Sequence, residues 1–360
     1  MKSSLSILCI AVLCIILSLG LWPFHAPRND VTWLKDRDGL RFGNYATVMS
    51  TGAFPADQSS QPRSCSVEMW LQAARAGNEG TVLTLYVPKQ PVVLSLRQSL
   101  GDLELRSGKD RRHRFYVNNV FRPGRPAFVT VTSGAQGTAV YVNGALLRTV
   151  RAFQFAPVAC AGRLIVGDSP LQQDPWSGQL WGLAIYASEL PAQAVLQHYR
   201  AWAHGGKPQA DPDQYMAGLY LFDERAGAIV HNHARPGLDL SIPSTYYVQD
   251  KIFLEPFWDE FAVSWSYVKG ILKNIVGFVP LGFCFCAYFE LIWKTRRAVL
   301  VTVVLGGAVS LTIEVLQGFL PTRDSGTTDL ITNTFGTWIG VVLYHAASAR
   351  LPLHLLTPEN

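Results

Sequence analysis

Residues 310–340 read SLTIEVLQGFLPTRDSGTTDLITNTFGTWIG. Much of this stretch is apolar, as in a membrane span, yet charged and amide side chains recur along it. A charged side chain inside a bilayer is costly unless it is paired, so such residues normally face the interior of a helix bundle. The stretch therefore predicts two apolar helices, joined by a polar turn, whose polar faces are turned toward other helices.

Polar side chains in this stretch recur three or four residues apart, a spacing that places them on one face of a helix. Ser310, Glu314 and Gln317 form such a face on the first predicted helix. Asp329 and Asn333 form another on the second helix, which also carries a Gly-x-x-x-Gly pair. Small residues at that spacing let a neighbouring helix approach closely.

Two more polar residues belong with these faces: Arg323 lies in the turn, and Asn274 lies on an earlier apolar run. With a rise of about 1.5 Å per residue, all of these groups fall in the outer half of a membrane. We therefore predict a polar binding pocket in the membrane, formed by Asn274, Glu314, Gln317, Arg323, Asp329 and Asn333. The alternative is a structural network in which Glu314 pairs with Arg323 and the two asparagines tie helices together.

Four apolar runs are long enough to cross a bilayer, at 5–22, about 270–292, about 298–320 and about 327–348. The basic sequence KTRR at 294–297 separates the second run from the third, and such loops stay in the cytoplasm. This arrangement predicts a multi-pass protein with both termini cytoplasmic and the region between the first two runs outside. The first run is interpreted as a retained anchor, because no clear signal-peptide cleavage site follows it.

The composition agrees with a protein that is partly embedded in the lipid bilayer. Apolar residues make up 49% of the chain and charged residues 16%, whereas soluble domains carry about 25% charge. The net charge of +5 is small and no basic run is interleaved with aromatic residues, so we predict no nucleic-acid partner. The six cysteines show no zinc spacing, and we predict no metal site and no cofactor. A calcium site formed by Asp168 and Asp174 stays open as an alternative. Cys65 and Cys160 can form a disulfide if their region lies outside the cytoplasm.

The region from about 31 to 250 consists of short alternating runs separated by turn residues. Runs at 66–72, 81–87, 127–133 and 138–150 read as strands. In the last of them, Asn143-Gly144 predicts a two-residue type I′ hairpin, because both residues tolerate positive φ. Many strands without intervening helices predict an all-β sandwich.

Three segments of this region resemble laminin-G-like, concanavalin A-like jelly-roll domains. They are CSVEMWLQ (65–72), RPAFVTVTSGAQGTAVYVNGALLRTV (125–150) and LIVGDSPLQQDPWSGQLWGLAIYASELPAQAVLQHY (164–199). The resemblance implies two packed antiparallel sheets, closed by a short helix at about 191–200, and a role in binding glycans or proteins.

A late segment, AGLYLFDERAGAIVHNHARPGLDLSIP (217–243), resembles the opening strands of such domains. The strand that normally follows them, GLRF (39–42), here comes near the start. The order predicts a permuted sandwich, whose two ends leave the domain close together and so suit insertion between membrane helices.

Catalysis by the sandwich would need two carboxylates facing each other across a cleft. The acidic residues Glu68, Glu79, Asp168 and Asp174 are isolated in the sequence. Glu68 alternates with apolar residues and is expected to face solvent, and Asp168 is expected to occupy a turn. Trp176 is expected to be buried. No catalytic constellation is recognised, so the prediction leans away from an enzyme.

The membrane segments resemble the VanZ family. The resemblance lies in NIVGFVPLGF (274–283), IEVLQ (313–317) and LPTRDSGTTDLITNTFGTWIG (320–340). The family pattern is matched at Asn274, Phe278, Pro280, Gly282, Glu314, Gln317, Arg323, Asp329, Asn333 and Gly336. The family is named for a membrane protein linked to low-level resistance to the glycopeptide teicoplanin. An inserted jelly roll departs from the short family form, so the resistance role does not transfer simply.

Together these features predict a mixed fold. An extracytoplasmic all-β jelly-roll sandwich (31–250) is inserted into an all-α four-span transmembrane bundle, made of the first span (1–28) and a VanZ-like domain (251–360). We expect a protein of the bacterial inner (plasma) membrane, part of the cell envelope. Its jelly roll would bind envelope glycan or a secreted protein, and its membrane pocket would bind a lipid-linked precursor or another amphiphilic molecule.

Two other functions stay open at this point. One is a membrane enzyme in which Glu314 or Asp329 acts as acid or base on a lipid-linked envelope substrate. The other is a membrane scaffold without a small-molecule site.

Overall fold

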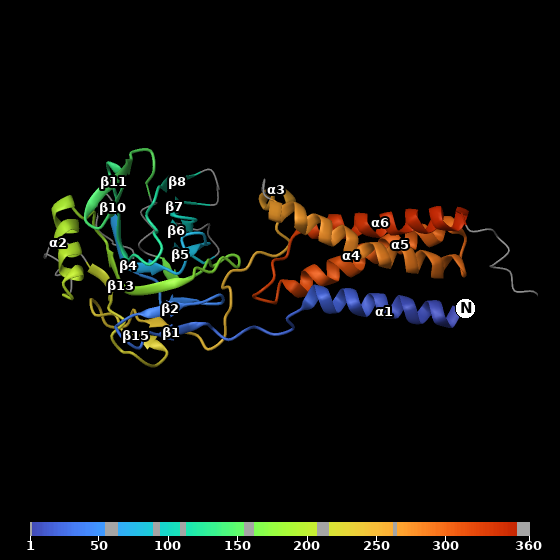
Figure 1. Ribbon diagram of the computed structural model, residues 1–360, viewed down its shortest axis with the longest axis horizontal. Helices are drawn as coiled ribbons and strands as arrows, with labels where there is room; N and C mark the ends of the chain where they lie inside the picture. The colour runs from blue at the N-terminus through green and yellow to red at the C-terminus, as the bar shows by residue number, and fades with distance from the viewer. Residues whose placement is uncertain are drawn as a thin grey trace, which may run out of the picture. The chain divides into compact units, whose positions relative to one another are not determined.

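The computed structural model describes residues 2–54, 64–88, 94–108, 113–154, 162–206, 216–261 and 265–350. The chain forms two compact units (Figure 1). Residues 27–250 make the β unit, and residues 1–26 together with 251–360 make the helical unit. The β unit is thus an uninterrupted insertion between the first helix and the remaining helices.

Two antiparallel sheets make up the β unit, and the prediction of an all-β sandwich is confirmed. The first sheet has the order β1 (Val31–Trp33), β2 (Leu40–Phe42), β13 (Gly178–Tyr186), β4 (Cys65–Ala73), β9 (Ala127–Gly134), β10 (Gly137–Val142) and β11 (Ala145–Val150), with β14 (Met216–Tyr220) also paired to β13. The second has the order β15 (Ile229–Val230), β16 (Leu240–Ser241), β3 (Val48–Ser50), β12 (Arg163–Val166), β5 (Glu79–Tyr86), β6 (Leu94–Ser99), β7 (Asp102–Arg106) and β8 (Arg114–Val117).

The sandwich interior is built from the apolar residues that alternate along these strands. Val67, Met69 and Leu71 on β4 belong to the same buried cluster as Leu94 and Leu96 on β6. Side chains two residues apart on a strand point to the same face, so this pattern fixes which face of each sheet is buried. A smaller core lies beneath helix α2 (Ala192–Ala203), which covers β13 and β14 on the outer face of the first sheet.

The predicted Asn-Gly hairpin forms between β10 and β11. Asn143 and Gly144 have φ values of 53° and 78°, and Val142 pairs with Ala145 across the turn. Asn143 also fixes the neighbouring strand, because its side-chain oxygen accepts a hydrogen bond from the Phe128 amide at 3.0 Å. The turn residues therefore set the register of three consecutive strands.

The late segment completes both sheets of the sandwich. β14 pairs with β13, which also pairs with β2, and β16 pairs with β3. The prediction that residues near 217–223 share the sandwich with residues near 39–49 is thereby confirmed. The two ends of the unit are adjacent as predicted, because the Tyr246 amide donates to the Pro27 carbonyl at 3.0 Å. A domain with adjacent ends can be inserted between two helices without separating them.

The helical unit contains α1 (Lys2–Leu21), α3 (Phe257–Glu260), α4 (Trp265–Glu290), α5 (Thr295–Gln317) and α6 (Thr327–Arg350). The four long helices alternate in direction along the chain. Gln317 reaches Gly20 where α5 and α1 end, and Asn274 reaches Asp329 in the first halves of α4 and α6. Helices α1 and α5 therefore run one way, and α4 and α6 run the other (Figure 1).

Small residues bring α6 into close contact with α4. A Cβ atom on Gly336 would overlap the carbonyl oxygen of Ile275, and one on Gly340 would overlap that of Val279. The Gly-x-x-x-Gly pair of the sequence thus packs directly on the α4 backbone, as small residues do between membrane helices.

Three helices are long and apolar enough to cross a membrane: Lys2–Leu21, Tyr267–Glu290 and Thr295–Gln317. The fourth predicted span corresponds to α6, which has 24 residues but is not one of these three.

Gly340→Ala should destabilise the helical unit, because the added methyl group has no space against the α4 backbone. We expect a loss of about 1–3 kcal/mol, as in other overpacked interiors. The matched control is Gly277→Ala on α4, where an added Cβ meets nothing within 4 Å. That change should be neutral or stabilising, by up to about 1 kcal/mol, through helix propensity. Melting temperatures of the full chain in detergent test this pair, and equal shifts would contradict the packing.

Candidate functional site

Several acidic residues gather at the end of the helical unit where α6 begins, among them Glu260, Glu314, Asp324 and Asp329, and we call it the acidic end. Glu314 is 1% exposed, and its Oε2 accepts a hydrogen bond from the Gly326 amide at 2.9 Å. Glu260 Oε2 accepts one from the Thr328 amide at 3.0 Å. The first amides of a helix lack intrahelical partners and carry partial positive charge, so both carboxylates stabilise the start of α6.

Two amide side chains of the predicted site tie helices together. Asn274 Nδ2 on α4 donates to Asp329 Oδ1 on α6 at 2.6 Å. Asn333 Nδ2 on α6 donates to Ser310 Oγ on α5 at 3.0 Å. Ser310, Asn333 and Glu314 are all buried. The two polar faces predicted from residue spacing therefore meet inside the bundle.

Arg323 does not pair with Glu314 in the described contacts, so this part of the predicted network is wrong. Its guanidinium donates instead to the carbonyl oxygens of Trp22 at 2.8 Å and Leu19 at 3.1 Å. Gln317 Nε2 donates to the Gly20 carbonyl at 2.7 Å. The last carbonyls of a helix need outside donors, and these two side chains supply them at the end of α1.

Lys251 supplies the corresponding donors for the end of α5. Its Nζ donates to the carbonyl oxygens of Gln317, at 2.7 Å, and Leu320. Burial lowers the pKa of Lys251, while the charges of Asp324 and Glu314 act in the opposite direction. A cation at a helix C-terminus is stabilising, so Lys251 is both a cap and a counter-charge for the acidic end.

Two acceptor atoms of this cluster have no hydrogen-bond partner among the described residues. They are Gln317 Oε1 and Asn333 Oδ1, and both are buried. A buried acceptor without a donor costs about 1–3 kcal/mol. Gln317 lies three residues after Glu314 on α5, and Asn333 binds Ser310, four residues before Glu314. Each of the two oxygens can receive a hydrogen bond from a hydroxyl, amine or water donor.

All six residues predicted from the sequence thus make contacts in this part of the helical unit, but they do not all contact one another. Asn274 and Asp329 bind each other, Glu314 binds the α6 start, and Arg323 binds α1. Sequence reasoning missed Glu260 and Lys251. Both lie on the segment before α4, and their only signal was charge next to an apolar run.

In the β unit, Glu68 is 1% exposed, so the expectation that it faces solvent is wrong. Its carboxylate accepts a hydrogen bond from the Tyr186 hydroxyl at 3.0 Å and lies 3.1 Å from His198 Nδ1. Glu68 does point away from the sandwich interior, but α2 covers that face and supplies His198. A glutamate on an alternating strand reaches solvent only where no further layer lies above it.

A second charged cluster lies on one face of β6, β7 and β8. Glu104 is buried and accepts hydrogen bonds from Arg97 at 3.2 Å and Arg106 at 2.6 Å, and it also contacts Arg114. Burial would raise the pKa of Glu104, but hydrogen bonds and charge from Arg106 and Arg97 outweigh it and lower the pKa. Arg97 also binds Asp174 through two nitrogens, at 2.6 and 2.8 Å.

Asp168 occupies a turn as expected, but its side chain is buried. Its Oδ1 accepts hydrogen bonds from the Ser169 and Asp174 amides, and its Oδ2 accepts one from the Tyr246 hydroxyl. Burial raises the pKa of Asp168 to about 7, although these hydrogen bonds act to lower it. Trp176 is buried as expected, with its Nε1 donating to Gln98.

Cys65 is disulfide-bonded. Its predicted partner, Cys160, lies outside the described residues.

Family models match both parts of the chain. The VanZ/LLP1 model matches residues 228–348, and the model of the concanavalin A-like lectin/glucanases superfamily (Laminin_G_3) matches residues 43–196. The chain is a VanZ-like protein that carries a concanavalin A-like domain. The VanZ-like match begins inside the β unit, so it includes β15 and β16 as well as α3, α4, α5 and nearly all of α6, but not α1. Among curated proteins, no sequence matches this chain.

Solved structures resemble the chain only weakly. A candidate carbohydrate binding protein from Bacteroides ovatus ATCC 8483 is 17% identical, with 59% of this chain and 61% of that chain covered and a TM-score of 0.40. The binding domain of botulinum neurotoxin serotype D is 14% identical, with 49% and 46% covered and a TM-score of 0.35. The SAP-like pentraxin from Limulus polyphemus is 16% identical, with 59% and 99% covered and a TM-score of 0.34. At these scores the likeness carries no inference about ligands.

Asp168 should give the stability of the β unit a distinctive pH dependence. Its folded-state pKa lies above the ordinary value of 3.8, so between about pH 4 and pH 7 the folded protein holds a proton that the unfolded chain has released. The free energy of unfolding therefore decreases as pH rises through this window, by at most about 1.4 kcal/mol per pH unit. Asp168→Asn removes the titration.

The melting temperature of the Asp168→Asn variant should fall less between pH 4 and pH 7 than that of the wild type. Scanning calorimetry of the full chain in detergent measures both profiles. Parallel profiles would show that Asp168 does not hold its proton in the folded protein.

Proposed function

We propose that this VanZ-like protein is a multi-pass protein of the bacterial plasma membrane with four spans, α1, α4, α5 and α6. Both termini would be cytoplasmic and the β unit would lie outside. The alternating helix directions support this, because they place Lys2, the 294–297 loop and the end of α6 at one end of the helical unit. Lys294, Arg296 and Arg297 make that end basic, which favours the cytoplasmic side.

The proposed function of the helical unit is to bind a lipid-linked or amphiphilic molecule of the cell envelope at the acidic end. The observation that carries this proposal is that Gln317 Oε1 and Asn333 Oδ1 are buried acceptors with no hydrogen-bond partner in the described part of the chain, on the two helices that also carry Glu314 and Asp329. A head group rich in donors, such as a sugar or an amine, would satisfy them. The polar pocket therefore consists of Asn274, Glu314, Gln317, Arg323, Asp329 and Asn333, with Glu314 as its central acceptor.

The β unit would bind an envelope glycan or a secreted protein. The concanavalin A-like match supports the choice, as does the charged face on β6, β7 and β8, where Arg106 and Arg114 are partly exposed. A role in glycopeptide resistance is the physiological expectation that goes with the VanZ-like region.

The topology is tested by proteolysis of sealed membranes. Protease added to the outer face of intact spheroplasts should cleave within the β unit, for example near exposed Arg225, and leave the 294–297 loop intact. Inverted vesicles should give the opposite pattern. A β unit that is cleaved only in inverted vesicles would contradict the proposal.

Glu314→Gln tests the binding function. Glutamine keeps the shape of the side chain and one acceptor oxygen but removes the charge. The variant should therefore bind a donor-rich or cationic ligand more weakly while its fold stays intact. Native mass spectrometry of the full chain extracted from bacterial membranes should show a retained envelope lipid in the wild type and at least about tenfold less in the variant. This corresponds to the loss of one charge-assisted hydrogen bond.

Asp259→Asn is the matched control, because Asp259 is an exposed carboxylate at the same end of the helical unit. It should retain the lipid at the wild-type level. Equal retention by all three proteins, with unchanged melting temperatures, would remove Glu314 from the site. A loss of retention that follows a loss of folding would assign it to the structural network instead.

A further inference from the structure

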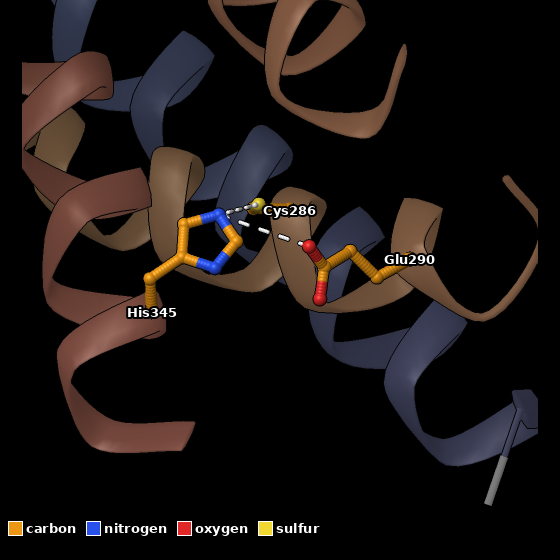
Figure 2. A group of neighbouring side chains, drawn as sticks. All are labelled: Cys286, Glu290 and His345. Carbon is orange, nitrogen blue, oxygen red and sulfur yellow. Dashed lines mark hydrogen bonds and ion pairs between the residues drawn. The ribbon is translucent and has the colours of Figure 1, made fainter. Parts of the chain in front are cut away.

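Three potential metal ligands converge at the opposite end of the helical unit. Cys286 and Glu290 lie on the last turns of α4, and His345 lies on α6 (Figure 2). His345 Nε2 is 3.9 Å from Cys286 Sγ and 3.7 Å from Glu290 Oε1. One ligand atom from each residue lies within 4.8 Å of the other two. This group lies roughly 18 Å along α4 from Asn274, at 1.5 Å per residue, and so is separate from the acidic end.

The helix packing explains why these residues meet. Cys286 and Glu290 are four residues apart and therefore share one face of α4. Helix α6 runs parallel to α4 and lies against it through Gly336 and Gly340. His345 follows Gly340 by five residues, and at that point α4 and α6 are still close together. The three side chains thus project from two backbones that small residues keep at a fixed short distance.

The set has the chemistry of a transition-metal site. Thiolate, imidazole and carboxylate are the three side-chain ligand types that bind Zn²⁺. With metal–ligand bonds of about 2.0–2.3 Å in tetrahedral geometry, neighbouring ligand atoms stand roughly 3.3–3.6 Å apart. The observed 3.7 and 3.9 Å exceed this by only a few tenths of an ångström. Three protein ligands also leave a fourth position for water or a substrate atom.

The polar atoms of Cys286, Glu290 and His345 make only long contacts with one another, so these contacts leave much of their hydrogen-bonding capacity unused. Glu290 Oε1 is buried and has no hydrogen-bond partner among the described residues. Cys286 is fully buried, and its contact to the imidazole is long even for sulfur. A buried carboxylate oxygen that lacks a donor is costly, and a bound cation would remove that cost.

We propose that Cys286, Glu290 and His345 bind a thiol-preferring divalent ion, with Zn²⁺ as the first choice. The ion cross-links α4 to α6 near the basic 294–297 loop and keeps one coordination position open. Sequence spacing did not reveal it, because the Cys-x-x-x-Glu pair is not a zinc motif and His345 lies 59 residues beyond Cys286.

The test uses the full chain in detergent, stripped with a chelator and dialysed against Zn²⁺ alone. The proposal predicts one bound ion per chain by elemental analysis, and a rise in melting temperature, since an ion that binds only the folded state stabilises it. Replacing Zn²⁺ with Co²⁺ should give an intense near-ultraviolet charge-transfer band, which reports a thiolate ligand directly.

Cys286→Ser should abolish the cobalt–thiolate band. Both Cys286→Ser and His345→Gln should weaken Zn²⁺ binding by about 100-fold or more. Loss of a residue that only hydrogen-bonds to a metal ligand costs about 10- to 100-fold, so a larger loss indicates a direct ligand. The matched control is Cys284→Ser, which removes a neighbouring buried thiol and should keep both the band and the stoichiometry. If Cys286→Ser fails to fold, His345→Gln still decides the matter. Absence of stoichiometric Zn²⁺ in the wild type, or equal binding by Cys286→Ser and Cys284→Ser, would overturn the proposal and leave a polar contact between helices.

Discussion

Backbone groups at the ends of apolar helices have to be satisfied by the protein itself, because a bilayer offers them no water. At the acidic end this requirement accounts for the contacts of five polar side chains. Arg323 and Gln317 supply donors to the last carbonyls of α1, and Lys251 supplies them to α5. Glu314 and Glu260 supply acceptors to the first amides of α6. The polar stretch in an otherwise apolar sequence is therefore first of all a set of helix caps.

The same residues carry more hydrogen-bond acceptors than the capping of helix ends requires. Capping α6 uses one oxygen of Glu314, and capping α1 uses only the amide nitrogen of Gln317. The remaining acceptors of Gln317 and Asn333 are buried without described donors. A purely structural network would satisfy them internally, because a partly satisfied polar network costs more than an apolar core. This surplus of acceptors is the observation on which the proposed binding site rests.

Local patterns predicted most of the architecture. The Asn143-Gly144 turn and the alternating strands indicated the sandwich, and spacing of three and four residues placed Ser310, Glu314 and Gln317 on one buried face. Partners distant in the sequence were beyond such reasoning. Arg323 binds carbonyls some 300 residues earlier, which no local spacing encodes. Glu68 was misassigned because alternation shows which face of a strand it occupies but not that α2 covers this face. The Cys286, Glu290 and His345 group requires knowing that α4 and α6 run parallel.

We propose that the acidic end holds a ligand and does not serve only as a junction of helices. The most direct measurement is a high-resolution structure of the full chain, extracted together with its surrounding lipid into lipid discs without detergent exchange. If a ligand binds there, we expect non-protein density within hydrogen-bonding distance of Glu314, Gln317 Oε1 and Asn333 Oδ1, continuous with an acyl chain beside α5 or α6. A closed acidic end, with these acceptors bound to protein groups or isolated waters and no such density, would contradict it.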